Sequence, residues 1–101
     1  QLWAGKVDLI KTGAEQYGDE NKNLLEKTCK KSDGTTVGPC CVEVTVQNLI
    51  DKGFVTTKEK DINGKLVIKN DAEKDKEKKI VNDNKVNICL ENNVVYSEFK
   101  N

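Results

Sequence analysis

Four cysteines have the most specific chemistry in this chain, because their number and spacing restrict what they can form. They are Cys29, Cys40, Cys41 and Cys89, in a chain of 101 residues. An even number of cysteines in a short chain is typical of a disulfide framework. A zinc site usually needs closely spaced Cys pairs or added histidines, and this chain has no His. We therefore expect disulfide bonds and no metal centre.

The pairing of these cysteines has two alternatives. Adjacent cysteines rarely bond to each other, because the backbone between them would be strained, which excludes a Cys40–Cys41 bridge. We favour Cys29–Cys40, which closes a loop, together with Cys41–Cys89, which ties this loop to the C-terminal strands. The rival pairing joins Cys29 to Cys41 and Cys40 to Cys89. A redox role would require an exposed thiol of low pKa, so we expect structural bridges.

The remaining side chains do not form a recognisable catalytic set. Without His, no Ser, Thr or Cys has the usual base to activate it. Carboxylates are abundant, but they alternate with lysines, as in residues 58–61 and 73–77. A catalytic carboxylate pair is normally held in an apolar cleft, where its pKa values are shifted. We therefore expect no enzymatic activity and no cofactor.

Two stretches contain oxygen ligands of the kind that Ca²⁺ binds. Residues 61–64 read Asp-Ile-Asn-Gly, and residues 82–84 read Asn-Asp-Asn. A calcium site needs about six to eight oxygens, usually from several carboxylates. Neither stretch continues the pattern, and lysines flank both. We expect a hairpin turn at the first stretch, a loop leading into a strand at the second, and no metal site.

The distribution of charge along the chain indicates which classes of partner it can bind. The chain has 17 basic and 17 acidic residues, interleaved along its length, and only 36% of its residues are apolar. A nucleic-acid interface needs clustered positive charge with stacking aromatics, which excludes that partner class. No run approaches the roughly 20 apolar residues of a membrane span. The chain starts at Gln1 without Met or signal peptide, so we expect residues upstream of it.

The first element that must position these residues is an amphipathic helix over residues 2–17. Its apolar positions recur at helical spacing. They are Trp3, Val7, Ile10, Ala14 and Tyr17. Gly18 marks the predicted end of this helix, as glycine often does.

An irregular connection follows over residues 18–41, anchored by Leu24 and Leu25. A short helix lies within residues 45–55, with Thr45 as the N-cap and Gly53 after its last turn. The run from 42 to 44 could instead form a brief strand, so the start of the helix stays open. Residues 18–55 thus connect the first helix to the sheet.

Residues 55–100 are expected to form a small antiparallel sheet. Asn63-Gly64 is a hairpin signal that would join strands near residues 55–61 and 65–69. The charged run 71–79 is expected to be an exposed loop. Residues 85–91 alternate, with apolar side chains at positions 86, 88 and 90, and strand 94–99 returns antiparallel after Asn92-Asn93. The prediction is one α+β domain, residues 1–101, with the N-terminal helix packed on the sheet.

Three segments carry a resemblance to a known family. They are residues 11–17 at the helix end, residues 44–55, and the terminal hairpin formed by residues 85–90 and 94–96. In order and spacing they resemble the soluble head domain of type IV pilins and pseudopilins, especially the short Gram-positive ones. The resemblance covers most of the chain.

This resemblance implies a long N-terminal helix whose hydrophobic first half lies upstream of Gln1. In such proteins that half anchors the subunit in the membrane and later forms the filament core. The implied function is a non-catalytic subunit of an extracellular pilus or pseudopilus, with copies of itself and other pilins as partners. Trp3, Val7 and Ile10 would pack against neighbouring subunits, with Trp3 equally suited to the core, and Tyr17 would face its own sheet. The alternative is a minor tip subunit or a secreted, disulfide-bonded binding or adhesion domain.

Overall fold

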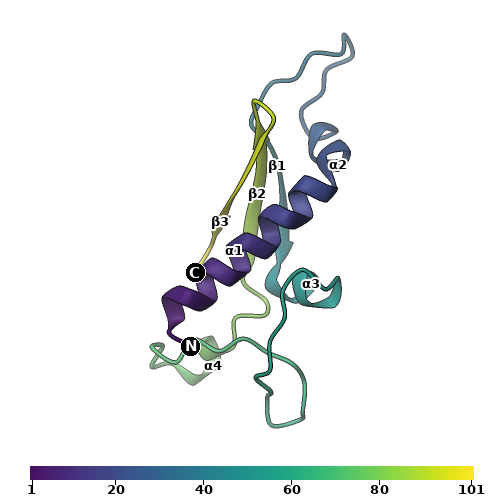
Figure 1. Ribbon diagram of the computed structural model, residues 1–101. Helices are drawn as coiled ribbons and strands as arrows, with labels where there is room; N and C mark the ends of the chain where they lie inside the picture. The colour runs from purple at the N-terminus through teal and green to yellow at the C-terminus, as the bar shows by residue number, and fades with distance from the viewer.

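A helix packed on a three-stranded antiparallel sheet forms the body of the protein (Figure 1). The computed structural model describes residues 1–101 without a gap. In chain order the elements are α1 (Trp3–Glu20), α2 (Lys22–Glu26), β1 (Cys40–Thr45), α3 (Val46–Asp51), α4 (Lys76–Lys79), β2 (Lys85–Glu91) and β3 (Val94–Phe99). The molecule is elongated, with principal extents of 51, 22 and 20 Å. The predicted α+β class, with an N-terminal helix and an antiparallel sheet, is confirmed.

Helix α1 buries the apolar stripe that its sequence predicts, but it is longer than predicted. Ile10 and Ala14 are fully buried, and Tyr17 is nearly so. The predicted end at Gly18 is wrong, because the helix continues to Glu20. A Cβ on Gly18 would lie 2.6 Å from a methyl carbon of Val95 and 2.9 Å from one of Ile88. Gly18 therefore lets the helix approach the sheet closely, and the packing that results outweighs its low helix propensity.

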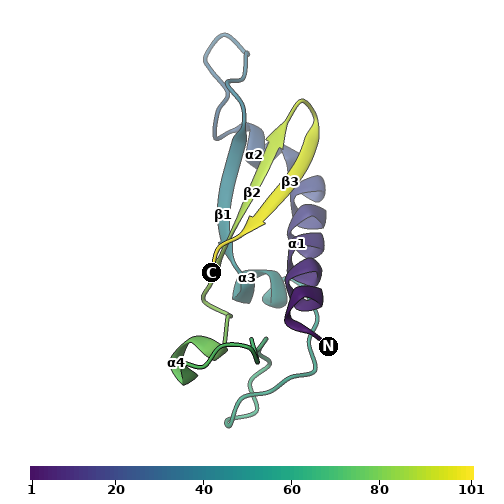
Figure 2. The same ribbon diagram turned by 90° about the vertical axis from the view of Figure 1, so that its left-hand side faces the viewer.

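The sheet has the order β1-β2-β3, with both pairs antiparallel. The predicted alternation of β2 is correct, since Val86, Ile88 and Leu90 are buried on the face toward α1. Asn92 and Asn93 both have positive φ, 51° and 64°. Two such residues form the turn type that matches the twist of a tight hairpin, so they join β2 to β3 directly. Figure 2 shows α1 on one side of the sheet only.

One hydrophobic core joins the helix stripe to the inner face of the sheet. It also takes in side chains from the connecting segments. Its buried members are Ile10, Ala14, Tyr17, Leu25, Cys40, Val46, Leu49, Val55, Ile68, Val81, Val86, Ile88 and Leu90.

The connection between α1 and the sheet contains a helix that the sequence pattern does not predict. Residues 18–41 were expected to be irregular, yet α2 occupies Lys22–Glu26. Leu25 is fully buried there, whereas Leu24 is 44% exposed, so one leucine of the pair anchors the segment. The ten residues between Cys29 and Cys40, residues 30–39, are all exposed. We call them the tip loop.

The short helix α3 begins at Val46, directly after the predicted N-cap Thr45, and a strand precedes it. The open alternative for residues 42–44 is resolved in favour of β1. Thr45 Oγ1 accepts a hydrogen bond from the Asn48 N–H (3.0 Å), and Asn48 Oδ1 accepts one from the Thr45 N–H (3.0 Å). This reciprocal pair is a capping box. Gly53, at φ 81°, ends the helix as expected.

The predicted strands at 55–61 and 65–69 are wrong. The turn forms, with the Gly64 N–H bonded to the Asp61 carbonyl (3.0 Å). Its flanks make only one isolated bridge to each other, Lys60 to Leu66, and one to another segment, Lys69 to Ile80. The third strand is β1, so the sheet consists of residues 40–45 and 85–99 and does not begin at residue 55. The first flank is mostly polar, and although Val67 and Ile68 of the second flank are buried, the position beside β2 is taken by β1. We call residues 56–66 the basal loop. The charged run beyond it contains the single turn of α4.

Candidate functional site

Two disulfide bonds are present, one from the connecting segment to β1 and one between β1 and β2, and no cysteine is free. Cys29 is bonded to Cys40, and Cys41 is bonded to Cys89. The expectation of a disulfide framework is confirmed, with the pairs arranged as in the first of the two alternatives. Cys40 belongs to the core on the inner face of the sheet, and its neighbour Cys41 points to the opposite face because side chains alternate along a strand. The two bonds therefore fasten both faces of β1.

Trp3 and Val7, two of the three residues expected at a subunit interface, are half-buried on the first two turns of α1. The Trp3 ring meets the Phe99 ring edge-on, with centroids 5.7 Å apart. Ile10 is different, because it is fully buried in the core of its own chain and has no surface to offer a neighbour. Its assignment to subunit packing is therefore incorrect. Tyr17 lies in the core, with its ring edge-on to Phe54 at 5.3 Å.

A buried lysine is the feature that sequence reasoning missed. Lys6 lies on the inward stripe of α1, four residues before Ile10, and only 7% of it is exposed. Its Nζ donates to Glu59 Oε1 (2.7 Å), to the Lys69 carbonyl (2.7 Å) and to Asp71 Oδ2 (3.5 Å). An ammonium group has three donors, so all of them are used. The signal in the sequence was a single cation on an otherwise apolar helix face.

The protonation of Lys6 follows from opposing effects. Burial alone would lower its pKa, but the hydrogen bond and charge of Glu59, with a smaller contribution from Asp71, outweigh it, and the pKa of Lys6 is raised above its ordinary value. The group is therefore a stable cation at neutral pH. It ties α1 to segment 59–71, and a nucleophilic role would require the opposite shift.

A surface hollow of about 530 Å³ lies beside Lys6. Its lining is mostly polar: Gln1, Lys6, Leu9, Thr56, Thr57, Lys58, Glu59, Ile68 and Asp71. Since the Lys6 ammonium is already satisfied, the hollow presents no buried, unpaired polar group to a ligand. The hollow is therefore a space between α1 and segment 59–71, which Lys6 holds together.

Asn82 fastens the same region from the other side. This side chain is 2% exposed. Its Oδ1 accepts from the Ile68 N–H (3.0 Å), and its Nδ2 donates to the Leu66 carbonyl (3.1 Å) and to Gln47 Oε1 (2.8 Å). Asn82, which the sequence offered as an oxygen ligand for calcium, instead bonds to protein groups through both its oxygen and its nitrogen. The basal loop is thus held at one end by Asn82 and at the other by Lys6.

The other calcium candidate is occupied in the same way. Asp61 Oδ1 accepts from the N–H groups of Asn63 (2.9 Å) and Lys65 (2.9 Å) and shapes the turn. Across the chain, no three or more His, Cys, Asp or Glu residues gather where they could hold a metal ion.

None of the helices has both the length and the apolar character needed to cross a membrane. No protein-family model matches the chain, and no curated protein or solved structure matches it significantly.

Proposed function

We propose that this protein is the non-catalytic head domain of a filament subunit of the type IV pilin kind. The observation that carries the proposal is the packing of α1 along one face of an antiparallel sheet, with Trp3 and Val7 half-buried at the N-terminal turns. In a filament, the helices of neighbouring subunits would meet at these residues. The contact would be heterologous, and the subunits would extend as an open helix.

The two disulfide bonds support an exported protein. Disulfides form and persist in oxidising compartments, which include cell surfaces. A chain with 36% apolar residues also benefits from covalent bridges, since a small domain buries little apolar surface. Before assembly, a membrane anchor in the upstream half of the helix would hold the head at the cell surface.

The coding frame upstream of Gln1 provides the first test. We expect a short basic leader, a cleavage site and about 20 apolar residues in helical phase with Trp3 and Val7. An ordinary signal peptide that ends near Gln1 would sink the proposal.

The full-length protein in its own cells provides the second test. We expect it in filaments sheared from the cell surface, and we expect Val7→Asp to reduce filament yield strongly. The matched control is Val37→Asp, at a residue of the tip loop that is 57% exposed and far from α1's first turns (Figure 1). Equal filament yields from the two variants would contradict a packing role for Val7.

A second candidate function is a secreted binding or adhesion domain. One observation favours it: the tip loop is wholly exposed, closed by Cys29–Cys40, and placed at the far end from the N-terminus (Figures 1 and 2). A closed loop loses less conformational freedom on binding. A signal peptide upstream, with loss of host-cell or glycan binding after substitutions in residues 30–39, would favour this function over the first.

A further inference from the structure

The basal loop lies at the end of the molecule where α1 begins. Both ribbon views place residues 56–66 and the N-terminus toward the same end, with the tip loop at the opposite end (Figures 1 and 2). Any chain upstream of α1 therefore leaves the head domain on the side of the basal loop. Under the proposed function, this is the side that faces the membrane.

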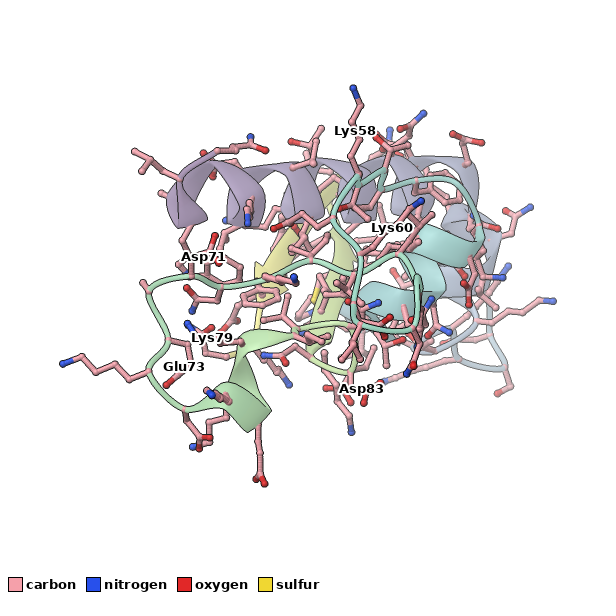
Figure 3. The ribbon with its side chains drawn as sticks, turned by 90° about the horizontal axis from the view of Figure 1, so that it is seen from below. Lys58, Lys60, Asp71, Glu73, Lys79 and Asp83 are labelled. Carbon is pink, nitrogen blue, oxygen red and sulfur yellow. A yellow bond between two sulfur atoms is a disulfide. The ribbon has the colours of Figure 1, made fainter.

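The outward charge of the basal loop is positive. Lys58, Lys60 and Lys65 are exposed, and none of them takes part in an ion pair. Figure 3 shows this end from below, with Lys58 extending away from the ribbon and Lys60 on the loop.

The two carboxylates of the loop offset this charge only in part. Glu59 is hydrogen-bonded to Lys6 (2.7 Å) and accepts from the Lys69 N–H (3.4 Å). Asp61 is held by two backbone N–H groups of its own turn. The Lys6 ammonium neutralises Glu59, so the three exposed lysines face one half-exposed carboxylate, Asp61, and the surface charge of the loop stays positive.

An apolar side chain lies between Lys60 and Lys65 in the sequence. Ile62 is 99% exposed, the highest value among the large apolar residues that reach solvent. The turn fixes this exposure, because Asp61 bonds on both its backbone and its side chain to residues 63–65. The Ile62 side chain packs on no part of the protein. Leu66, 42% exposed, adds apolar surface at the base of the loop.

We propose that the basal loop docks on an anionic lipid surface, with Ile62 entering the headgroup region and the three lysines pairing with lipid phosphates. This inference rests on the proposed function for the orientation of the head. Each lysine near an anionic membrane raises binding roughly fivefold, and an inserted aliphatic side chain adds to it. The contact would hold a membrane-anchored head upright beside the bilayer, where the anchor supplies a high effective concentration.

The test measures co-sedimentation of the 101-residue protein with vesicles at millimolar lipid. We expect binding to phosphatidylglycerol–phosphatidylcholine vesicles at low salt and none to phosphatidylcholine alone. Ile62→Ser should weaken the partition several-fold, and the triple change Lys58→Glu, Lys60→Glu, Lys65→Glu should weaken it more than tenfold. All four side chains are exposed, so the fold should survive, and circular dichroism verifies this.

Matched controls come from the tip loop. Val37→Ser removes an exposed apolar residue, and Lys30→Glu with Lys31→Glu reverses charge, at the opposite end of the molecule. We expect both controls to bind vesicles like the parent. The inference is overturned if anionic vesicles bind no protein, or if tip-loop variants weaken binding as much as basal ones. An acidic protein as the true occupant would appear as the first of these outcomes.

This test is independent of the proposed function, because it uses the chain without upstream residues. Vesicle binding together with an ordinary signal peptide upstream would keep the lipid contact and remove the pilin assignment. An apolar upstream helix without vesicle binding would keep the pilin assignment and remove the lipid contact.

Discussion

The tip loop and the basal loop each contain a turn shaped by an aspartate side chain, but one loop is held by a disulfide bond and the other by ion pairs and hydrogen bonds. In the tip loop, Asp33 Oδ1 accepts from the N–H (2.9 Å) and the hydroxyl (2.6 Å) of Thr35. The bond from the Thr35 hydroxyl, and to a smaller extent the bond from its N–H, lowers the pKa of Asp33. Asp61 shapes the basal turn in the same way. The tip loop is then closed by a disulfide bond, whereas the basal loop is held by the Lys6 ion pairs and by Asn82.

The difference shows what each kind of fastening requires from the surrounding residues. A covalent bond needs no packing, and all residues of the tip loop are exposed. Polar fastenings work best when water is excluded. The basal loop accordingly continues into Val67 and Ile68, which are 1% and 2% exposed, and Lys6 itself is buried. Reduction of the disulfide should therefore loosen the tip loop, whereas alkaline pH, which removes the charge of Lys6, should loosen the basal loop.

The largest effect is expected from removing the bond of the tip loop. Replacing Cys29 and Cys40 by Ser should lower the free energy of unfolding by about 3 kcal/mol, because the unfolded chain regains the freedom of an 11-residue separation. Urea denaturation measures the loss, and hydrogen exchange should show faster exchange in the tip loop with the basal loop unchanged. Equal acceleration at both loops would show that the two fastenings are not independent.

The next effect concerns the ion pairs of the basal loop. Lys6→Met should lower the free energy of unfolding by about 2 kcal/mol, as for a hydrogen-bonded charge pair whose carboxylates can still reach water. The control is Lys11→Met on the same helix, where no ion pair is present. A loss of the same size in the control would contradict the role of Lys6.

The pH dependence of that loss has a defined sign. Since the pKa of Lys6 is raised above 10.5, its contribution is fully present below that value and disappears as pH rises through the folded-state pKa. The parent protein and Lys6→Met should therefore differ in melting temperature at neutral pH and converge at strongly alkaline pH. Constant separation across this range would count against the ion pair as the cause.

The smallest effect is expected on the sheet, between the two loops. Glu43 of β1 pairs with Lys100 (3.0 Å) and Lys85 (3.4 Å) on the solvent-exposed surface. The hydrogen bond from Lys100, followed by the charges of Lys100 and Lys85, lowers the pKa of Glu43 from 4.5 despite partial desolvation. Its contribution is present above pH 4.5 and is lost as pH falls through the lower, folded-state pKa. Glu43→Gln should therefore destabilise slightly at pH 7 and not at pH 2, in thermal melts at low salt.

Periodicity alone predicted much of the core. The stripe of α1 and the alternation of β2 follow directly from burial on one face, and Thr45 was identified as a cap from its own chemistry. The strain of a bond between adjacent cysteines excluded a Cys40–Cys41 bridge, and the structure has the favoured one of the two remaining pairings. These features depend on local patterns that tertiary contacts reinforce.

The remaining features depend on contacts between distant residues. Gly18 continues a helix because Val95 and Ile88 approach it, and no local signal encodes this approach. Residues 55–69 have a correct turn but no sheet neighbour, because β1 occupies the position beside β2. Lys6 was overlooked because its partners lie 53 and 65 residues away in the sequence. Its place on an apolar stripe was the one available clue.

The adjacent positions of Cys40 and Cys41 determine how this protein would transmit mechanical force. A pull on the two chain ends passes from residues 1–29 across the first disulfide to Cys40, through one peptide bond to Cys41, and across the second to residues 89–101. Residues 30–39 and 42–88 lie outside this path. While both bonds are intact, tension can unravel α1, α2 and β3, but it cannot extend the tip loop, α3, the basal loop or α4.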